Sequence, residues 1–191
     1  MRRYPLATVI SQSADGPFVS HLPLVVEQNG EELMLFGHLA RANPHWRMMD
    51  GQMISVIFNG PNTYVTPKWY SENDVPTWNY AVVHAKGQSS LIEDSAGIQR
   101  CLEKLTQFAE SGSSDPWEFW IPDDLSAPGI IEKVIVGFSI KIDHLQAKFK
   151  LSQNRSEQDR TGVIRGLQTR RDEMSREILN LMKTLISEKK P

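Results

Sequence analysis

Apolar and polar residues alternate through most of the first half of the chain, a pattern that predicts β-strands. Residues 6–12 and 18–27 are rich in β-branched and apolar side chains and flank a turn cluster at 15–17. The Asn-Gly pair at 29–30 favours a type I′ turn, so residues 31–39 are expected to return as a partner strand. The chain is therefore expected to begin with antiparallel hairpins.

More strands are predicted in the middle of the chain. Residues 53–59 and 62–66 are separated by Gly60-Pro61, a pair that favours a turn. Residues 78–92 alternate long enough for one extended strand, one face of which would carry Trp78, Tyr80, Val82 and His84. The sheet is therefore expected to contain at least six strands.

Period-two alternation returns near the end of the chain, at residues 134–142. This pattern predicts a half-buried strand, and we expect residues 145–151 to form its partner.

Three segments carry helical signals instead. Asn43 followed by Pro44 predicts an N-cap and a short helix to about Met49. Apolar residues at helical spacing predict a helix over 95–111. From Ser156 to the end, a three-four apolar spacing broken only at Arg171 predicts a helix that docks on the barrel or on a partner subunit.

Many short strands, few helices and antiparallel hairpins predict a mainly β fold with flanking helices, a small closed or split barrel. We expect the barrel to span residues 1–154, with the helix at 95–111 inserted into it. Residues 155–191 are then a C-terminal helical extension. A parallel α/β sheet is not expected, because regular helices do not separate the strands.

Composition narrows the function classes only slightly. The formal net charge of −2 gives no general attraction to nucleic acid or to anionic membranes, so any such contact has to be local. Cys101 is the single cysteine, which excludes an internal disulfide and suits a reducing, cytoplasmic location. The sequence contains no apolar run of transmembrane length and no apolar stretch directly after its first residues, so we expect neither a transmembrane helix nor a secretory signal.

The segment from Gly37 to Trp46 is the first candidate for chemistry. It joins a strand end to a helix start, where free N–H groups attract an anion, and Arg41 can add forked bonds to a phosphate. The alternative is that Asn43 only caps the helix and Arg41 is a solvated surface residue.

Other reactive residue types have structural explanations. The histidines at 21, 38, 45 and 84 match no usual metal-ligand spacing. Cys101 falls on the apolar face of its predicted helix and is expected to be a buried, inert thiol. Ser20 and His21 are adjacent on a strand and point to opposite faces, so they do not indicate a hydrolase.

Two clusters remain open to more than one interpretation. The aromatic residues between 64 and 80 suit either the wall of a flat ring system or the core of a dimer. A basic stretch at 148–171 suits either a solvated helix face or contact with DNA. Its seven basic residues are Lys148, Lys150, Arg155, Arg160, Arg165, Arg170 and Arg171.

Several strings in this sequence resemble the PaiB family, whose members are FMN-binding split-barrel proteins described as negative transcriptional regulators of sporulation and protease genes. The resemblance runs in order from about residue 5 to residue 167. It is carried by SHLPL at 20–24, GHLARANP at 37–44, GPNTYVTPKWY at 60–70, VPTWNY at 75–80, HAKG at 84–87, PW at 116–117 and KFKLSQN at 148–154, followed by Asp159, Gly162 and Val163.

The resemblance implies a split barrel of the pyridoxamine-phosphate-oxidase type, a homodimer, and FMN at the subunit interface. The FMN phosphate would lie at His38, Arg41 and Asn43. The flavin ring would lie near Ser20, His21 and the strand that carries Trp78, Asn79 and Tyr80. Lys150 and Gln153 would reach the flavin of the partner subunit.

The function implied by this resemblance is negative regulation of transcription by an FMN-binding protein. The alternative is a flavin-dependent oxidoreductase acting on a small molecule. The sequence shows no helix-turn-helix pattern, so DNA contact would come from residues 148–171 or from a partner protein. Family members usually carry a further helical segment before the first strand. We expect either that the start codon was set too late or that this protein lacks that helix.

Overall fold

The computed structural model describes residues 1–72, 74–123, 127 and 129–187, and its main element is a seven-stranded, mostly antiparallel sheet. The hydrogen-bonded strand order is β2-β1-β5-β6-β7-β4-β3. The strands are β1 Leu6–Ser13, β2 Gly16–Pro23, β3 Val25–Asn29, β4 Glu32–Ala40, β5 Met53–Val65, β6 Thr77–Ile92 and β7 Ile135–Lys150. The predicted mainly β class with flanking helices is therefore confirmed.

The chain forms two compact units, which are described separately below. The first contains residues 1–58 and 84–146, and the second contains residues 59–83 and those from 147 onward. Strands β5, β6 and β7 each contribute residues to both units. The division expected from the sequence, a barrel at 1–154 and an extension at 155–191, instead places all residues of β5, β6 and β7 in the barrel. That division stays a prediction.

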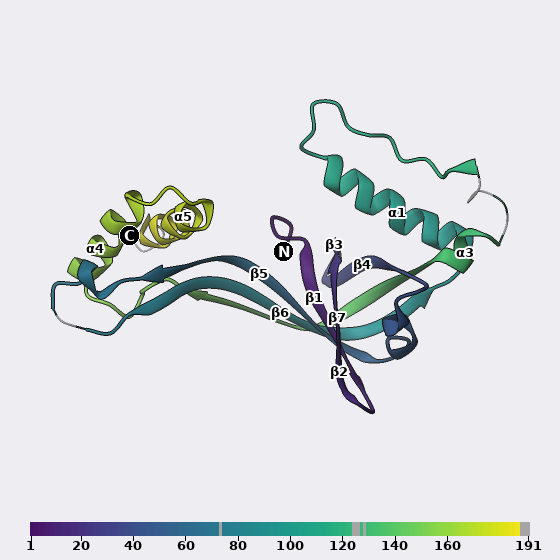
Figure 1. Cartoon of the computed structure of the whole chain (residues 1–191), viewed down its shortest axis with the longest axis horizontal. Helices are drawn as coiled ribbons and strands as arrows, with labels where there is room; N and C mark the ends of the chain where they lie inside the picture. Colours follow the sequence, from purple (N-terminus) through teal and green to yellow (C-terminus); the bar gives the residue numbers. More distant parts are fainter. Residues whose placement is uncertain (73, 124–126, 128, 188–191) are drawn as a thin grey trace. The chain divides into compact units, whose positions relative to one another are not determined.

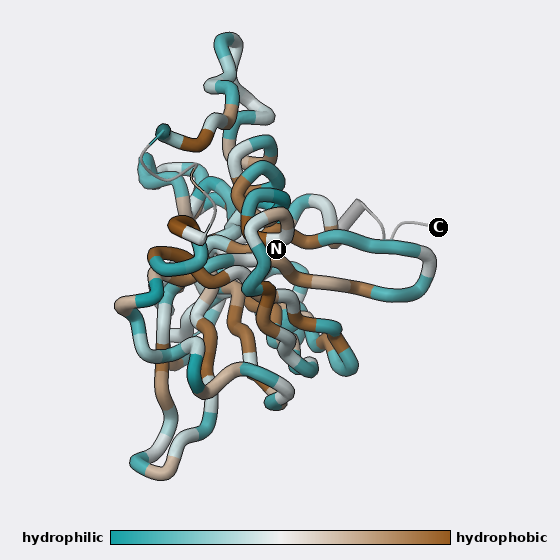
Figure 2. Tube along the Cα trace, turned by 90° about the vertical axis from the view of Figure 1, so that its right-hand side faces the viewer, coloured by the Kyte–Doolittle hydropathy of each residue, from teal (hydrophilic) through white to brown (hydrophobic). Residues whose placement is uncertain are grey.

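In the first unit, apolar side chains from alternate strand positions form the core, and Figure 2 shows hydrophobic stretches of the trace separated by hydrophilic ones. The core residues include Ala7, Val9, Leu35, Leu39, Ile54, Val56, Phe58, Val136, Phe138 and Ile140. Helix α1, Ser95–Glu110, packs against β3 and β4 (Figure 1). Because Gly137 has no side chain, the Cys101 sulfur of α1 can lie close to β7; a Cβ at Gly137 would be 3.2 Å from it.

The strand predicted at residues 18–27 was wrong, because two strands lie there at opposite edges of the sheet. Pro23 ends β2, and the Leu24 amide turns away to donate to the Pro5 carbonyl. The predicted second hairpin does form, between β3 and β4. Its turn is shifted by one residue: Asn29 pairs with Glu32, and only Gly30 has positive φ.

Two predicted strand breaks are also absent. Strand β5 runs straight through Gly60-Pro61, where Gly60 allows close approach to β6, since a Cβ there would lie 2.9 Å from the Ala81 carbonyl oxygen. Strand β7 continues to Lys150, so residues 145–151 are not a separate partner strand. Glycine and polar residues marked these sites as turns in the sequence, but pairing with neighbouring strands keeps both segments extended.

The predicted helices are found with changed boundaries. The segment after Asn43 is a 3-10 helix, η1 Pro44–Met48, and a second one, η2 Pro67–Trp69, follows β5. A short helix, α3 Ile131–Val134, precedes β7. The C-terminal helix is two helices, α4 Glu157–Gln168 and α5 Glu173–Ser187, and its predicted last residues, 188–191, lie outside the described residues.

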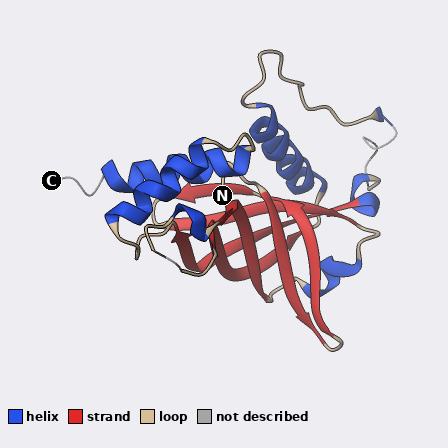
Figure 3. Cartoon of the chain, turned by 60° about the vertical axis from the view of Figure 1, so that its left-hand side comes forward, coloured by secondary structure: helices blue, strands red, loops and turns tan. Residues whose placement is uncertain are grey.

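In the second unit, α4 and α5 cover one face of the strand ends (Figure 3). The apolar core between them comprises Val65, Leu151, Val163, Leu167, Ile178, Leu179 and Met182. Trp69 of η2 lies directly against α4, because Gly162 and Gly166 leave room for it. The Arg170 guanidinium lies over the Trp69 ring, 4.9 Å from its centroid.

Candidate functional site

A buried polar network holds the segment after β4 against the first two strands. The His45 side chain is fully buried (0% exposed), and its ring nitrogens lie 2.8 Å from Ser20 Oγ and 2.8 Å from Ser11 Oγ. Asn43 caps η1 by accepting from the His45 amide, and its Nδ2 donates to Ser20 Oγ over 3.2 Å. Because Ser11 belongs to β1 and Ser20 to β2, this network fixes residues 43–45 to the barrel.

Burial makes His45 a neutral, structural group. Removal from water lowers the pKa of His45, and the Phe18 ring packs 4.8 Å from the imidazole. A neutral imidazole has one donor and one acceptor nitrogen, which the two serine hydroxyls can satisfy. Burial also lowers the pKa of His38. Both side chains are therefore expected to be uncharged at neutral pH.

These lowered values make the stability of the folded chain depend on pH. Stability is full above the ordinary histidine pKa of about 6.5 and falls as the pH drops through it, because the unfolded chain then binds protons that the folded chain does not. The loss is at most about 1.4 kcal/mol per pH unit for each histidine. Urea unfolding at about pH 7.5 and about pH 5.5 measures it. His45→Gln should reduce the pH dependence, because it removes one of the two histidines whose pKa is lowered by burial.

Arg41 is held in place rather than solvated. Its Nη2 donates to Glu93 Oε1 over 2.6 Å, its Nε donates to the Glu132 carbonyl over 2.9 Å, and its backbone amide bonds to Val134. Only 21% of the Arg41 side chain is exposed, whereas the Glu93 side chain is more open. The solvated-surface alternative for Arg41 is therefore not what the structure shows.

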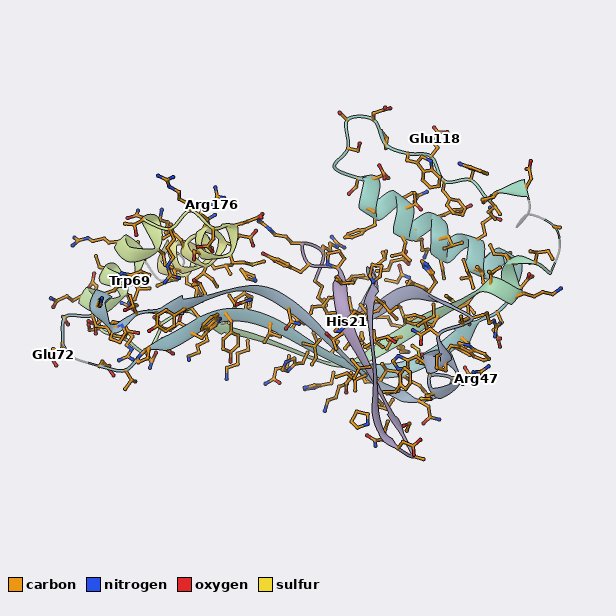
Figure 4. The ribbon with its side chains drawn as sticks, in the orientation of Figure 1. His21, Arg47, Trp69, Glu72, Glu118 and Arg176 are labelled. Carbon is orange, nitrogen blue, oxygen red and sulfur yellow. The ribbon has the colours of Figure 1, made fainter. Side chains whose placement is uncertain are left out.

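Sequence reasoning missed a second arginine beside Arg41. The guanidinium groups of Arg41 and Arg47 lie 4.6 Å and 4.9 Å from the centroid of the Trp46 ring. Trp46 is itself fixed by a 3.1 Å bond from its Nε1 to the Arg41 carbonyl. Arg47 is exposed on η1 (Figure 4). One indole therefore orients two forked cationic groups within a single segment.

The other first-unit residues predicted to hold the cofactor, His38, Ser20 and His21, differ in burial and in their hydrogen-bond partners. His38 lies on β4, and in the part of the chain that the structure describes its Nδ1 is a buried atom without a hydrogen-bond partner. Ser20 is buried in the His45 network, whereas His21 is exposed, with its Nδ1 3.2 Å from Thr8 Oγ1. Since Ser20 and His21 point to opposite faces of β2, the structure does not bring them together.

The remaining predicted cofactor residues belong to the second unit. Trp78 is exposed on β6 (48%), and its Nε1 donates to Asn62 Oδ1 over 3.1 Å. Asn79 faces the opposite way and is fully buried. The Asn79 amide donates to Ser152 Oγ over 3.1 Å, close to Met182 of α5, so its observed role is to join β6 to the helical layer. Its predicted contact with FMN stays a prediction.

Lys150 and Gln153 lie at the end of β7. Lys150 Nζ donates to Thr77 Oγ1 over 2.7 Å. Gln153 accepts from the Leu151 amide and donates to the Phe149 carbonyl, which closes a turn in which Ser152 has a φ of 61°. Both side chains remain exposed, and their predicted reach to a partner's flavin stays a prediction.

The basic stretch at 148–171 is not one free cationic surface. Arg155 is paired with Asp74, and Arg170 donates to Thr63 Oγ1 over 2.6 Å while stacking on Trp69. Arg160 is half-buried, whereas Arg165 and Arg171 are exposed. Part of the positive charge of this stretch is therefore already used in contacts within the second unit, and only part of it remains exposed.

The structure also shows where the cysteine and the possible metal ligands lie. Cys101 is buried on α1, so the prediction of a buried cysteine is confirmed, and burial raises the pKa of its thiol. Within the described ranges, no three His, Cys, Asp or Glu side chains come together in a way that could hold a metal ion. No helix in those ranges combines the length and apolar character needed to cross a membrane.

Known proteins resemble this chain in sequence and in fold. The model of the FMN_bind_2 family, described as "Putative FMN-binding domain", matches residues 1–144. Protease synthase and sporulation protein PAI 2 of Bacillus subtilis is 35% identical over 179 residues, which are 92% of this chain and 84% of that protein. This match spans nearly the whole chain, including the segment with Arg41, Asn43 and Arg47.

Two solved structures share the fold at low sequence identity. The flavocytochrome Anf3 from Azotobacter vinelandii has a TM-score of 0.59 at 20% identity, over 82% of this chain and 67% of that one. The FAD and heme binding protein from Mycobacterium smegmatis has a TM-score of 0.57 at 18% identity, over 78% and 67%. Together with the strand order, these matches confirm the expected split-barrel fold.

Proposed function

The chain belongs to the PaiB family of FMN-binding split-barrel proteins, and on that premise we propose that its first unit holds the FMN phosphate beside Arg41 and Arg47. FMN is its cofactor. The observation that carries the proposed placement is the pair of guanidinium groups oriented by Trp46. A phosphate is recognised well by such forked donors, which form charge-assisted bonds in pairs.

The surrounding residues fit a phosphate in two further respects. The unpartnered Nδ1 of His38 is a free polar atom on β4, the strand that leads into this segment. The network of Ser11, Ser20, Asn43 and His45 holds the segment rigid, which limits the entropy lost on binding. Because η1 is a short 3-10 helix, we assign the binding to side chains rather than to a helix dipole. Bound FMN would supply hydride or electron transfer.

The proposal includes a homodimer in the cytoplasm. The outward face of β6 in the second unit carries Trp78, and the neighbouring Tyr64 ring lies 6.0 Å from it. Exposed aromatic groups of this kind are enriched at subunit interfaces and can contact a flavin. Sedimentation at micromolar concentration should give about twice the 21.7 kDa chain mass. A monomer that binds FMN tightly would exclude a shared site.

For the biological role we propose negative regulation of transcription. The support is the similarity to a protein named for protease synthesis and sporulation, over most of both chains. Direct DNA contact would use the exposed arginines of the helical layer, Arg165 and Arg171, together with Arg176 of α5 (Figure 4). The formal net charge of −2 means that this contact has to be local.

Gel shifts on DNA from the protein's own upstream region test this role. Binding should weaken with salt at a log–log slope of about −0.9 per phosphate contacted, and Arg165→Gln or Arg171→Gln should each reduce that slope by about 1. Lys133→Gln, at an exposed position in the first unit, is the matched control. If no gel shift is seen and the protein sustains turnover driven by NADH or NADPH, the proposed role as a regulator is wrong and the flavin-dependent oxidoreductase is supported instead.

A further inference from the structure

A cavity of about 500 Å³ lies along helix α1 in the first unit. One side of it is the helix face with Glu103, Thr106 and Glu110, and the other is the segment that follows the helix. Figure 1 shows this segment turning back along α1. The Trp117 amide donates to Glu110 Oε2 over 3.1 Å, which ties the segment to the helix. The volume is within the range of small-molecule sites, about 300–1,000 Å³.

The lining of this cavity is acidic and aromatic. Three carboxylates line it, from Glu103, Glu110 and Glu118, and among the residues that the structure describes no lysine, arginine or histidine lines it. The Trp117 and Phe119 rings form an edge-to-face pair with centroids 6.2 Å apart. Trp117 is nevertheless 50% exposed, so this large ring is not used to fill the core. Figure 4 shows Glu118 on the same returning segment.

This lining does not suit a phosphate-containing ligand or a metal ion. A phosphate or a flavin nucleotide would meet only negative charge here, so the cavity is not a second FMN site. A metal ion needs converging ligands, and among the residues that the structure describes no such group of three is present. The three carboxylates that line the cavity are therefore not assigned to a metal ion.

We propose that this cavity binds a small organic ammonium cation. An ammonium head is large enough to lie between carboxylates that do not converge, and it is attracted to the faces of tryptophan and phenylalanine. The carboxylates of Glu103, Glu110 and Glu118 supply the compensating charge, and Trp117 and Phe119 supply the aromatic wall. This site is separate from the proposed FMN site and does not rest on it.

Calorimetric titration with choline tests the proposal, because choline has a neutral isostere. Choline should bind saturably, and 3,3-dimethyl-1-butanol, in which carbon replaces the ammonium nitrogen, should bind at least about tenfold more weakly. Trp117→Ala should weaken choline binding by about tenfold. Glu118→Gln should weaken it by about threefold at low salt and by less at high salt.

Trp120→Ala is the matched control, because Trp120 is 58% exposed on the same segment but does not line the cavity. It should leave choline binding unchanged. Melting temperature and FMN uptake should stay the same in all three variants, which shows that any loss of choline binding is local. Failure of choline to saturate, equal binding of the neutral isostere, or equal effects of Trp117→Ala and Trp120→Ala would each overturn the proposal.

Discussion

Arg41→Ala is expected to weaken FMN binding by about 10- to 150-fold, the effect of losing a hydrogen bond between charged groups. The Arg41 guanidinium is already oriented by Trp46 and by the Glu132 carbonyl, so little conformational entropy is lost when it binds a phosphate. Fluorescence titration with FMN measures the change, because flavin emission usually changes on binding.

Glu93→Gln is the matched control for Arg41→Ala. Both substitutions remove the same ion pair, in which Arg41 Nη2 lies 2.6 Å from Glu93 Oε1. If Arg41 binds the phosphate, removing the competing carboxylate should leave FMN affinity unchanged or raise it, opposite to the effect of Arg41→Ala. If the two substitutions weaken binding equally, Arg41 acts only as a structural ion-pair partner.

Gly162→Ala is expected to destabilise the second unit by about 3 kcal/mol or more, since overpacking that moves backbone is costly. A Cβ at Gly162 would lie 1.9 Å from the Trp69 carbonyl oxygen, so either α4 or η2 has to shift. Alanine normally stabilises a helix interior relative to glycine by about 0.5–1 kcal/mol, so a loss of stability in Gly162→Ala would indicate the close packing of Trp69. Urea unfolding followed by circular dichroism measures the change.

Gly112→Ala provides the comparison for that substitution. A Cβ at Gly112 would meet nothing within 4 Å, so the change there should alter stability by less than about 0.5 kcal/mol. Equal unfolding midpoints for Gly162→Ala and Gly112→Ala would mean that Trp69 does not pack against α4 as the structure shows.

Local signals in the sequence predicted local structure correctly. Asn43 caps η1 with its own side chain, as predicted, and Ser156, where the last helical segment was predicted to begin, caps α4 in the same way. The exposed face of β6 also follows from simple alternation, since Trp78 and His84 face outward while Asn79 and Ala85 are buried. These features depend on neighbours a few residues away.

Features set by distant parts of the chain were not predictable. Gly60 allows a strand to pass close to Ala81 instead of making a turn, and only the sheet order explains that role. Pro23 separates strands at opposite edges of the sheet, although residues 18–27 read as one continuous apolar run.

The candidate site was predictable only in part, for the same reason. Arg41 and Asn43 lie in a short string that can be recognised in the sequence. The link from His45 to Ser11 joins residues 34 positions apart and depends on the pairing of β1 with β2. Predicting Arg47 would have required knowing that two guanidinium groups, those of Arg41 and Arg47, lie over the Trp46 ring. The burial of Asn79 depends on which sheet face α4 and α5 cover, which strand alternation does not specify.

Parallel titration with FMN and riboflavin tests the central claim most directly, because the two ligands differ only in the phosphate. If the first unit holds that phosphate through Arg41 and Arg47, FMN should bind stoichiometrically and at least about tenfold more tightly than riboflavin. Arg41→Ala should then reduce this preference while leaving riboflavin affinity unchanged. Equal affinity for FMN and riboflavin in the unaltered protein would contradict the phosphate site.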